Sequence, residues 1–367
     1  MRIATRAVTV CAALLCVNAV LADEPVFMRY TDLKAEASLG EFQPVPRDQS
    51  DSLFGTVINA NAGSGIAGNS AALAAFGRAV QNWQNVLGDA VTLNINIDMA
   101  ALEPNTLGST STPKYTNTYT TIRNLVAGGG DTGSAAEAAT LSYLPTISQF
   151  GADRPPGFTL STTMWATRAN LLALGVPQSS LGGYGTSDGS ITFGTGIPWD
   201  YDSSNGITPG TFAFESTAMH EIGHVLGFTS EVDYVDWCLK EGLTDTLWPR
   251  PLDLFRFAAG NVPATSSAFT TNARDLAPGG TDYLCYVLGT IQMATGSFAG
   301  DGNQASHWKD FLGLGLMDPT SDPGGMKLIG GNDLLAMDLI GWQIVPEPTT
   351  LALLVVGLSA MAIRRRK

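Results

Sequence analysis

Hydrophobic positions recur with two different periods in the first third of the chain, and each period predicts one kind of element. Residues 71–86 carry apolar side chains every three or four positions, which is the spacing of one helix face. These apolar positions are Leu73, Phe76, Val80, Trp83 and Val86. Residues 91–97 alternate apolar with polar side chains, as in a half-buried strand, and residues 54–60 have strand composition. A strand, a helix and a strand in this order predict the opening of an α/β or α+β fold.

The middle of the chain has shorter and less regular patterns. Residues 104–118 and 127–134 are rich in Gly, Ser and Thr, and this composition predicts loops. Residues 161–174 have helical spacing, whereas residues 190–193 have the composition of a short strand.

Two further helices are predicted nearer the C-terminus. Residues 212–226 predict a helix that Thr211 caps and that carries Glu215 in its first turn. Residues 332–342 predict a closing helix, with Gly341 as its stop.

The helix predicted over residues 212–226 contains the pattern His-Glu-Ile-Gly-His. His220 and His224 are four positions apart, so they project from the same helix face and can bind one zinc ion at about 2.0–2.1 Å. Glu221 lies beside the first ligand, where a carboxylate can take a proton from a water molecule and later give it to a leaving amine. The pattern therefore predicts a catalytic zinc site.

The residues after the helix narrow the kind of zinc site. Gly227 follows the second histidine by three positions and predicts a left-handed residue that ends the helix sharply. A third ligand must come from beyond this turn. Ser230 is a poor zinc ligand, Glu231 and Asp233 are nearby acidic candidates, and His307 is the third of only three histidines in the chain. We favour His307.

Together these residues resemble the metzincin zinc proteases, whose motif reads HExxHxxG. Met317 follows His307 by ten positions and resembles the Met-turn of that class. A third histidine displaced by a long insertion resembles leishmanolysin. The resemblance implies an α+β zincin fold, with a twisted mixed sheet and the active-site helix above, up to about residue 228. An irregular lower half with a C-terminal helix, residues 229–344, would then complete a metalloprotease domain over residues 51–344.

The resemblance implies a secreted zinc endopeptidase that cleaves proteins or peptides. His220, His224 and His307 would bind zinc, Glu221 would be the general base, and Met317 would lie under the histidines. The substrate would pair with a strand edge, for which residues 189–194 are our candidate.

Two alternatives remain beside this interpretation. A gluzincin would take its third ligand from a later helix, and Glu241 is the available residue, although Gly227 argues against that class. The other alternative is a non-catalytic surface or biofilm-matrix protein with a zinc site, although a structural site would not need Glu221.

The N-terminus resembles a secretory signal peptide. Arg2 and Arg6 precede an apolar stretch that ends in small residues, so cleavage before Asp23 is expected. Residues 1–22 would then be removed. Residues 23–50 lack a clear period and would form an N-terminal arm that could serve as a propeptide.

The C-terminus, residues 345–367, has three parts. These are Pro-Glu-Pro at residues 346–348, an apolar stretch at residues 351–363, and a basic cluster at residues 364–367. This tail resembles the PEP-CTERM sorting signal of Gram-negative bacteria. The resemblance implies recognition by an exosortase, transient membrane anchoring through residues 351–363, and export to the cell surface or the extracellular space.

Charge and composition limit the classes of molecule that could bind this chain. Hydrophobic residues make up 44% of the 367 residues, enough for a sizeable core. The predicted mature part, residues 23–348, holds 14 of the 20 basic residues and all 33 acidic ones, a net charge of −19. Such an acidic chain offers no basic patch for phosphates, so nucleic acid is excluded as a partner.

Two remaining features concern cross-links and a second cation. Cys238 and Cys285 are the cysteines that remain after the predicted signal peptide, and export predicts a disulfide between them. Residues 200–206 faintly resemble a calcium loop, but Thr211 stands where a closing acidic ligand is needed. A solvated turn is therefore the better interpretation there.

Overall fold

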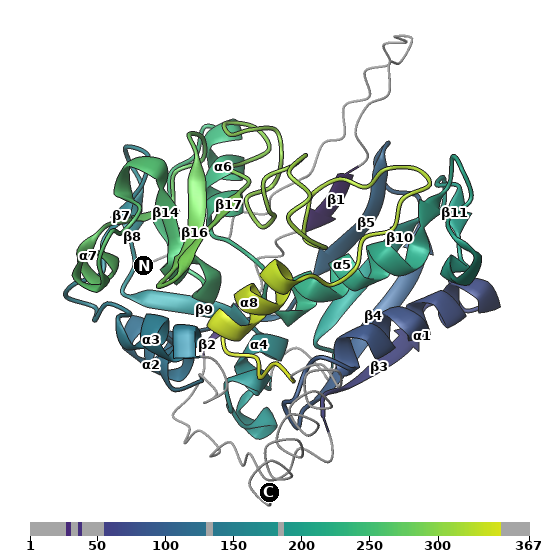
Figure 1. Cartoon of the computed structure of the whole chain (residues 1–367), viewed down its shortest axis with the longest axis horizontal. Coiled ribbons are helices and arrows are strands. Elements are labelled where there is room, and N and C mark those ends of the chain that lie inside the picture. The colour runs from purple at the N-terminus through teal and green to yellow at the C-terminus, as the bar shows by residue number, and fades with distance from the viewer. Residues whose placement is uncertain (1–26, 31–35, 39–54, 130–134, 183–186, 346–367) are drawn as a thin grey trace, which may run out of the picture.

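The computed structural model describes residues 27–30, 36–38, 55–129, 135–182 and 187–345. The predicted signal peptide, most of the N-terminal arm and residues 346–367 of the sorting tail lie outside the described residues. Helices and strands of the described part form a mixed α+β fold with one larger sheet and several small ones (Figure 1).

The helices of the described part are α1 Ser70–Gln84, α2 Tyr119–Gly129, α3 Ala135–Ser142, α4 Arg168–Ala173, α5 Phe214–Leu226, α6 Val232–Lys240, α7 Ser266–Thr271 and α8 Gly331–Leu339. The strands of its first half are β1 Phe27–Tyr30, β2 Glu36–Ser38, β3 Val57–Ala62, β4 Thr92–Ala100, β5 Thr106–Ser111, β6 Lys114–Thr118, β7 Ala152–Asp153, β8 Thr159–Leu160 and β9 Thr163–Thr167. Those of its second half are β10 Gly189–Gly194, β11 Trp199–Asp200, β12 Phe212–Ala213, β13 Thr246–Leu247, β14 Arg256–Ala258, β15 Arg274–Asp275, β16 Asp282–Tyr286 and β17 Gly289–Met293.

The larger sheet has five strands in the order β1-β5-β10-β4-β3. β3 pairs parallel with β4, and β4 pairs parallel with β10. β5 runs antiparallel to β10, and β1 lies parallel to β5 on its other side. The strands predicted over residues 54–60, 91–97 and 190–193 correspond to β3, β4 and β10, so these three predictions are confirmed.

Two long helices, α1 and α5, pack against each other and against this sheet (Figure 1). α1 confirms the helix predicted over residues 71–86, and its apolar stripe turns Phe76, Val80 and Trp83 into the core. The side chain of Asn69 caps its start by accepting a hydrogen bond from a first-turn backbone N–H. The Trp83 indole donates to the carbonyl of Met219 in α5 at 2.8 Å, which ties the two helices together.

The prediction of a loop over residues 104–118 is wrong, because this stretch forms β5 and β6. β5 faces α5 with Gly108 and Thr110, so its inward positions carry no apolar side chain that would show a period of two. Threonine nevertheless suits a pleated, half-buried surface. Of the second predicted loop, residues 127–129 end α2, and residues 130–134 lie outside the described part.

The helix predicted over residues 161–174 is only half correct. Residues 163–167 form β9, which pairs antiparallel with β6, and only α4 is helical. Thr167 caps α4 by accepting from the backbone N–H of Asn170. Tertiary pairing with β6 therefore overrides the helical spacing of the first five residues.

The helix that carries the His-Glu-Ile-Gly-His pattern begins two residues later than predicted. α5 starts at Phe214, its cap is Ala213, and no side chain caps it, so the prediction of Thr211 as the cap is wrong. Residues 212–213 instead form β12, which pairs with β11. Glu215 does lie in the first turn, as predicted.

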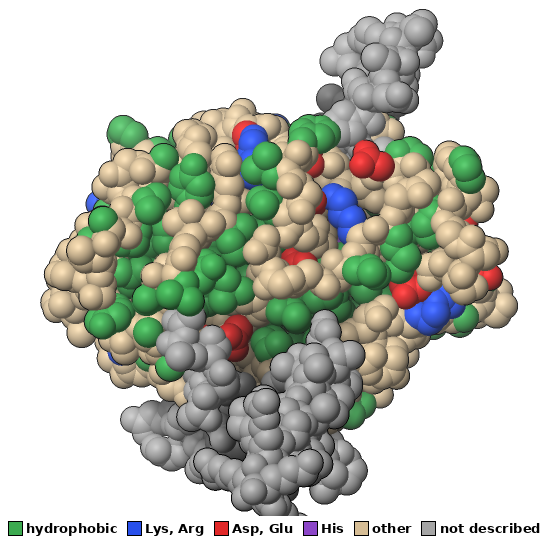
Figure 2. All heavy atoms as spheres, viewed as in Figure 1, with side chains coloured by type: hydrophobic (Ala, Val, Ile, Leu, Met, Phe, Trp, Pro, Cys, Tyr) green, Lys and Arg blue, Asp and Glu red, His purple; other side chains and the backbone are tan. Residues whose placement is uncertain are grey.

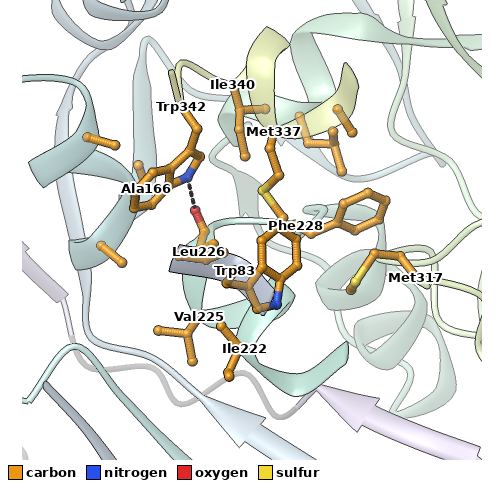
Figure 3. Packing of buried hydrophobic residues seen from close by; sticks show 14 of the residues in the cluster. Trp83, Ala166, Ile222, Val225, Leu226, Phe228, Met317, Met337, Ile340 and Trp342 are labelled. Atoms are coloured by element: carbon orange, nitrogen blue, oxygen red, sulfur yellow. Dashed lines mark hydrogen bonds between the residues drawn. The ribbon is translucent and has the colours of Figure 1, made fainter. Parts of the chain in front are cut away.

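The second half contains more regular structure than the sequence indicates. β14, β16 and β17 form an antiparallel sheet, and α6 and α7 flank it (Figure 1). The closing helix is confirmed as α8, and Gly341 has a φ of 105° just beyond it. Trp342 then donates its indole N–H to the carbonyl of Leu226 at 2.8 Å, which ties the segment after α8 to the last turn of α5 (Figure 3).

The predicted disulfide between Cys238 and Cys285 is not formed. Cys238 lies on α6 in a small apolar cluster, whereas Cys285 lies on β16 in the main core. Each thiol is buried among its own apolar neighbours, so the two elements are packed without a covalent link.

The surface reflects the low charge content of the chain. Figure 2 shows few charged side chains on the face that it presents, and they are scattered rather than gathered. Within the described residues, no helix is both long and apolar enough to cross a membrane.

Candidate metal centre and its carboxylate

The helix that carries the zinc-binding pattern is buried along its whole length. α1 packs on one side of α5 and β5 on another, while Trp342 is bonded to its last turn. His220 and His224 have no exposed surface. The helix thus presents both imidazoles from one face into the interior, as their spacing predicts.

His307 lies 83 residues after His224 and is brought back by a network of buried polar groups. The carboxylate of Asp233 accepts hydrogen bonds from the backbone N–H groups of Ala305 and Ser306 and from the Ser306 hydroxyl. The backbone N–H of Ser230 donates to that hydroxyl at 2.9 Å. Asp233 and Ser230 therefore anchor the segment that carries His307.

The three imidazoles converge on one point. The Nε2 atom of His220 lies 3.1 Å from that of His307 and 3.1 Å from that of His224, and the third Nε2 separation is 3.2 Å. The other nitrogen of each ring, Nδ1, faces a backbone carbonyl oxygen. Nδ1 of His220 lies 2.8 Å from the carbonyl oxygen of Leu316, and Nδ1 of His224 lies 2.8 Å from that of Phe228. Nδ1 of His307 lies 3.1 Å from the carbonyl oxygen of Gln304.

These contacts assign the protons on the rings. A carbonyl oxygen accepts only, so each Nδ1 carries the hydrogen and each Nε2 is left with a lone pair. Three lone pairs that face one another at 3.1–3.2 Å repel unless a cation lies among them. Within the described part of the chain, these histidines are the one group of three His, Cys, Asp or Glu side chains close enough to share a metal ion.

Burial keeps the three rings neutral. It lowers the pKa of His220 and His307 well below the usual value, and the neighbouring histidines lower it further. Burial also lowers the pKa of His224 to about 4. Neutral imidazole is the form that binds metals, so protons compete weakly at this site.

The turn after α5 and the segment around Met317 complete the surroundings of the histidines. Gly227 has a φ of 119° in the left-handed region and ends the helix, as predicted. Met317 is buried, and a Cβ added to Gly223 would lie only 2.5 Å from its sulfur. Met317 thus packs against α5 at Gly223, which stands between the two motif histidines in the sequence.

Asp333 of α8 holds the Met317 segment in place. Its carboxylate accepts from the Trp308 indole at 2.8 Å and from the backbone N–H groups of Leu316 and Met317 at 2.8 and 3.1 Å. The carbonyl of Leu316 in turn faces His220. The closing helix therefore positions one of the three imidazoles.

The Glu221 side chain lies next to β5 and is fully buried. Its Oε2 accepts a hydrogen bond from the Thr110 hydroxyl at 2.5 Å, whereas its Oε1 has no hydrogen-bond partner. A Cβ added to Gly108 would lie 2.5 Å from Oε1, so only glycine leaves room for the carboxylate. Burial raises the pKa of Glu221 to about 8, and the Thr110 hydroxyl opposes this shift.

Gly108 and Thr110 were not expected to contribute to the site. They alternate on one face of β5, and the stretch was predicted to be a loop. The sequence signal that could have found them is the Thr-Leu-Gly-Ser-Thr-Ser run itself, if it is taken as a strand with a small and polar inner face.

The alternative third ligands have other partners. Glu241 is the cap residue of α6, its side chain is 46% exposed, and its ion-pair partner is Lys240. The Glu231 carboxylate accepts from the Trp165 indole at 3.0 Å and pairs with Arg250 at 3.3 Å. Neither carboxylate belongs to the histidine cluster.

The polar loop over residues 200–206 is a capped turn. Asp202 accepts from the backbone N–H and the hydroxyl of Ser204, and Asp200 accepts from the backbone N–H of Thr208 at 2.8 Å. These bonds lower the pKa of both carboxyls. The carboxylates of this turn therefore accept hydrogen bonds from within the loop itself.

The predicted substrate edge at residues 189–194 is wrong. This stretch is β10, which lies in the middle of the sheet between β5 and β4. Both of its edges are therefore taken by neighbouring strands, and no peptide can add to it.

A comparison with protein families finds a match to the PEP-CTERM protein-sorting motif over residues 345–367. Comparisons with curated proteins and with solved structures find no significant match. The sorting motif confirms the prediction for the tail. It implies recognition of the tail by an exosortase and export to the cell surface or the extracellular space of a Gram-negative bacterium.

Proposed function

We propose that this exported protein is a zinc-dependent endopeptidase of metzincin type. The observation that supports the proposal most is the convergence of three Nε2 atoms that all carry lone pairs, at 3.1–3.2 Å from one another. Four ligands placed tetrahedrally at about 2.0–2.1 Å from zinc lie about 3.3 Å apart. The donor set thus fits zinc in chemistry and in size, with His220, His224 and His307 as ligands.

Three protein ligands leave a fourth position open, which distinguishes a catalytic zinc site from a structural one. When bound, zinc supplies a Lewis acid that polarises a carbonyl group and lowers the pKa of a water molecule. Residues of the chain itself would carry out the remaining chemistry. Zinc would also lower the pKa of the nearby Glu221 carboxyl, because a positive charge favours the ionised form.

Glu221 is the general base in this proposal. Thr110 holds Oε2, and this leaves Oε1 able to accept a proton from water while the water oxygen bonds to the scissile carbonyl carbon. Glu221 then gives that proton to the amine nitrogen as the carbon–nitrogen bond breaks. The histidines stay neutral throughout, since each Nδ1–H is bonded to a carbonyl.

The test compares casein cleavage by the mature exported protein with cleavage by its Glu221→Gln variant. The variant keeps all three histidines, so both proteins should bind one zinc per chain. A general base contributes roughly 10²–10⁴-fold, so the variant should lose cleavage by about that factor. Equal cleavage by both proteins would contradict the role of Glu221.

A second candidate is a non-catalytic surface protein with a zinc site. One observation favours it: His220, Glu221, His224 and His307 all have zero exposed surface. In that case both the parent protein and the Glu221→Gln variant bind zinc, and neither cleaves any peptide.

A further inference from the structure

We propose that the outer face of α6 is a binding site for an uncharged polysaccharide, with the Trp237 indole as the surface on which a sugar ring stacks. The site consists of Tyr234 and Trp237 of α6, Phe298 beside this helix, and Asp245 of the loop that follows it, and we call it the α6 platform. It uses neither zinc nor Glu221. The inference therefore adds a binding function to the proposed one and can be tested separately.

The inner face of α6 is fixed to the rest of the protein. Three of its side chains are buried in an apolar cluster: Val232, Val235 and Cys238. The Asp236 carboxylate accepts hydrogen bonds from the backbone N–H groups of Phe298 and Ala299 at 2.9 and 2.7 Å. A helix that is held in this way on one side loses little conformational freedom when a ligand binds to its other side.

Two aromatic rings lie next to each other on the outer face of α6. Tyr234 and Trp237 are three positions apart, so they project from the same side of the helix. Their ring centroids are 5.9 Å apart and their planes meet at 23°, which is a nearly parallel arrangement. Trp237 is 42% exposed, whereas Trp83 and Trp308 have no exposed surface. The Trp237 indole therefore presents a flat apolar surface to solvent, and Tyr234 holds its orientation.

A third ring extends the platform along the helix. Lys240 follows Trp237 by three positions, which is about 4.5 Å along the axis of a helix. Its ammonium group lies 4.2 Å from the centre of the Phe298 ring, and Phe298 is 55% exposed. Exposed rings are thus spread along one side of α6. This arrangement suits an extended chain of several sugar units better than a single sugar.

The polar groups beside Tyr234 are a carboxylate and two hydroxyls. Asp245 is exposed, and its carboxylate accepts from the Tyr234 hydroxyl and, at 2.8 Å, from the backbone N–H of Thr246. The hydroxyls of Thr159 and Thr246 are exposed and lie 2.8 Å apart. Each oxygen of a carboxylate can accept two hydrogen bonds, so Asp245 can also accept from a ligand. A ligand at this place would find hydrogen-bond acceptors next to an apolar surface.

This combination fits a hexopyranose ring. Such a ring has apolar C–H groups on its two faces and hydroxyl donors around its edge. One face can therefore lie on the indole of Trp237 while a hydroxyl at the edge donates to Asp245.

Two other kinds of polymer fit the platform poorly. The acidic groups of an anionic polysaccharide would lie close to Asp245 and to Glu241, whose side chain is 46% exposed. A proline-rich peptide also binds to aromatic side chains, but its carbonyl groups need donors, and the Tyr234 hydroxyl already donates to Asp245. An uncharged polysaccharide remains as the ligand that matches both the rings and the acceptors.

Isothermal titration calorimetry of the mature exported protein with six soluble oligomers tests the inference. Four are uncharged hexaoses, of β-1,4-glucose, β-1,3-glucose, α-1,6-glucose and β-1,4-N-acetylglucosamine, and the others are a guluronate hexaose and a proline decapeptide. At least one uncharged hexaose should bind, equally well with and without zinc. Its affinity should change by less than about twofold between low and high salt, because stacking is not an interaction between charges. The guluronate hexaose and the proline peptide should not bind.

Variants of two exposed rings locate the site. Trp237→Ala should weaken binding of the hexaose about tenfold or more, and Trp237→Phe, which keeps a ring, should weaken it about threefold. The matched control is Phe311→Ala, which removes a ring that is 82% exposed on another segment and should leave the affinity unchanged. Guanidinium unfolding of each variant checks that the fold is retained.

Each of four results would overturn the inference. The parent protein could bind none of the uncharged hexaoses. Trp237→Ala could bind the hexaose as well as Phe311→Ala does, which would place the sugar elsewhere. The proline peptide could bind and lose its affinity in Trp237→Ala, which would make the platform a peptide site. Sedimentation could show a dimer that Trp237→Ala dissociates, which would make a second copy the occupant. Peptide cleavage enters none of these results, so they hold whether or not the proposed function fails.

Discussion

Thr110 and Gly108 determine how the carboxylate of Glu221 lies, although neither belongs to the zinc-binding pattern. The Thr110 hydroxyl fixes Oε2 at 2.5 Å, and the missing side chain of Gly108 leaves space for Oε1. In the proposed mechanism, holding one oxygen of the carboxylate would leave the other oxygen available to accept the proton from water. The hydroxyl is thus a positioning group, and its effect should appear in turnover rather than in binding.

Replacing Thr110 by valine should lower kcat about tenfold or more, because the isosteric side chain keeps the packing and loses the hydrogen bond to a buried charged group. KM and zinc content should stay near those of the parent protein. Thr110→Ser retains the hydroxyl and should recover most of the activity. Steady-state kinetics of the three proteins check this, and equal kcat for valine and threonine would contradict it.

The protonation of the histidines determines how zinc binding depends on pH. A histidine with the usual pKa of about 6.5 gains a proton as the pH falls below that value, and each such proton weakens metal binding about tenfold per pH unit. Burial lowers the pKa of His224 to about 4 and lowers those of His220 and His307 as well. The depressed values move this competition to lower pH.

Zinc affinity should therefore change little between pH 7 and pH 5. A short, unstructured peptide of residues 218–226, with ordinary histidines, should lose affinity steeply over the same range. Competition with a chromophoric chelator at each pH measures both. A protein that loses zinc as steeply as the peptide between pH 6.5 and pH 5 would show that its histidines titrate as solvent-exposed groups do.

At the scale of elements, periodicity predicted the parts that face an apolar core. α1 and β4 carry their buried side chains at helical and alternating spacing, and Trp83, Leu93 and Ile95 have no exposed surface. β5 was not predicted because its inward-facing residues, Gly108 and Thr110, contact the carboxylate of Glu221 and are not apolar core residues. The strand residues that contact Glu221 are thus the ones that do not follow the alternation of apolar and polar positions.

The histidine cluster itself was predictable for a different reason. His220 and His224 follow from local spacing, and His307 follows from the small number of histidines in the chain. The roles of Asp233 and Ser230 depend on contacts with Ser306 across more than 70 residues, which no local pattern encodes. The cysteine pairing failed for the same reason, because pairing depends on distance in space.

Two helical glycines should respond to alanine with opposite signs. Gly77 in α1 is exposed, and a Cβ there meets no atom within 4 Å, so Gly77→Ala should stabilise the protein by about 0.5–1 kcal/mol. In α5, a Cβ on Gly223 would lie 2.5 Å from the sulfur of Met317. Gly223→Ala should therefore destabilise it by about 1–3 kcal/mol, as overpacked cores do.

Denaturant unfolding of the zinc-free proteins measures both changes. The double variant Gly223→Ala with Met317→Ala removes the sulfur that causes the clash, so it should be more stable than the sum of the two single changes predicts. Strict additivity would mean that Met317 does not pack against this turn of α5.

At the scale of the whole molecule, buried polar links rather than covalent ones hold the segments of the second half, residues 229–344, in place. Asp233 connects the start of α6 to the His307 segment, and Asp333 connects α8 to the segment around Met317. Such satisfied networks fix relative positions as a disulfide would, but without an oxidation step. The absence of a bond between Cys238 and Cys285 agrees with this arrangement.

The separate burial of the two thiols makes a prediction about their chemistry. The folded mature protein should react slowly with a thiol reagent, because both sulfurs are buried and burial raises the pKa of Cys285 to about 12. Unfolding in guanidinium without a reductant should expose two thiols per chain. Cys238→Ala and Cys285→Ala should each expose one, and each should cost about 1–2 kcal/mol of stability, less than the roughly 2–5 kcal/mol of a lost disulfide.

If a disulfide between Cys238 and Cys285 does form on export, the same thiol titration would reveal it and would contradict the separate burial of the two thiols. The unfolded parent protein would then show no thiol, whereas each single variant would show one, because the partner of the replaced cysteine is released. Forming that bond would require α6 and β16 to leave their separate clusters, since a disulfide holds its two Cα atoms about 4.4–6.8 Å apart. Because Asp233 of α6 holds the segment that carries His307, moving α6 would also shift that histidine, so the oxidised and reduced proteins would differ in zinc affinity. Measuring both forms would show whether zinc binding depends on this packing.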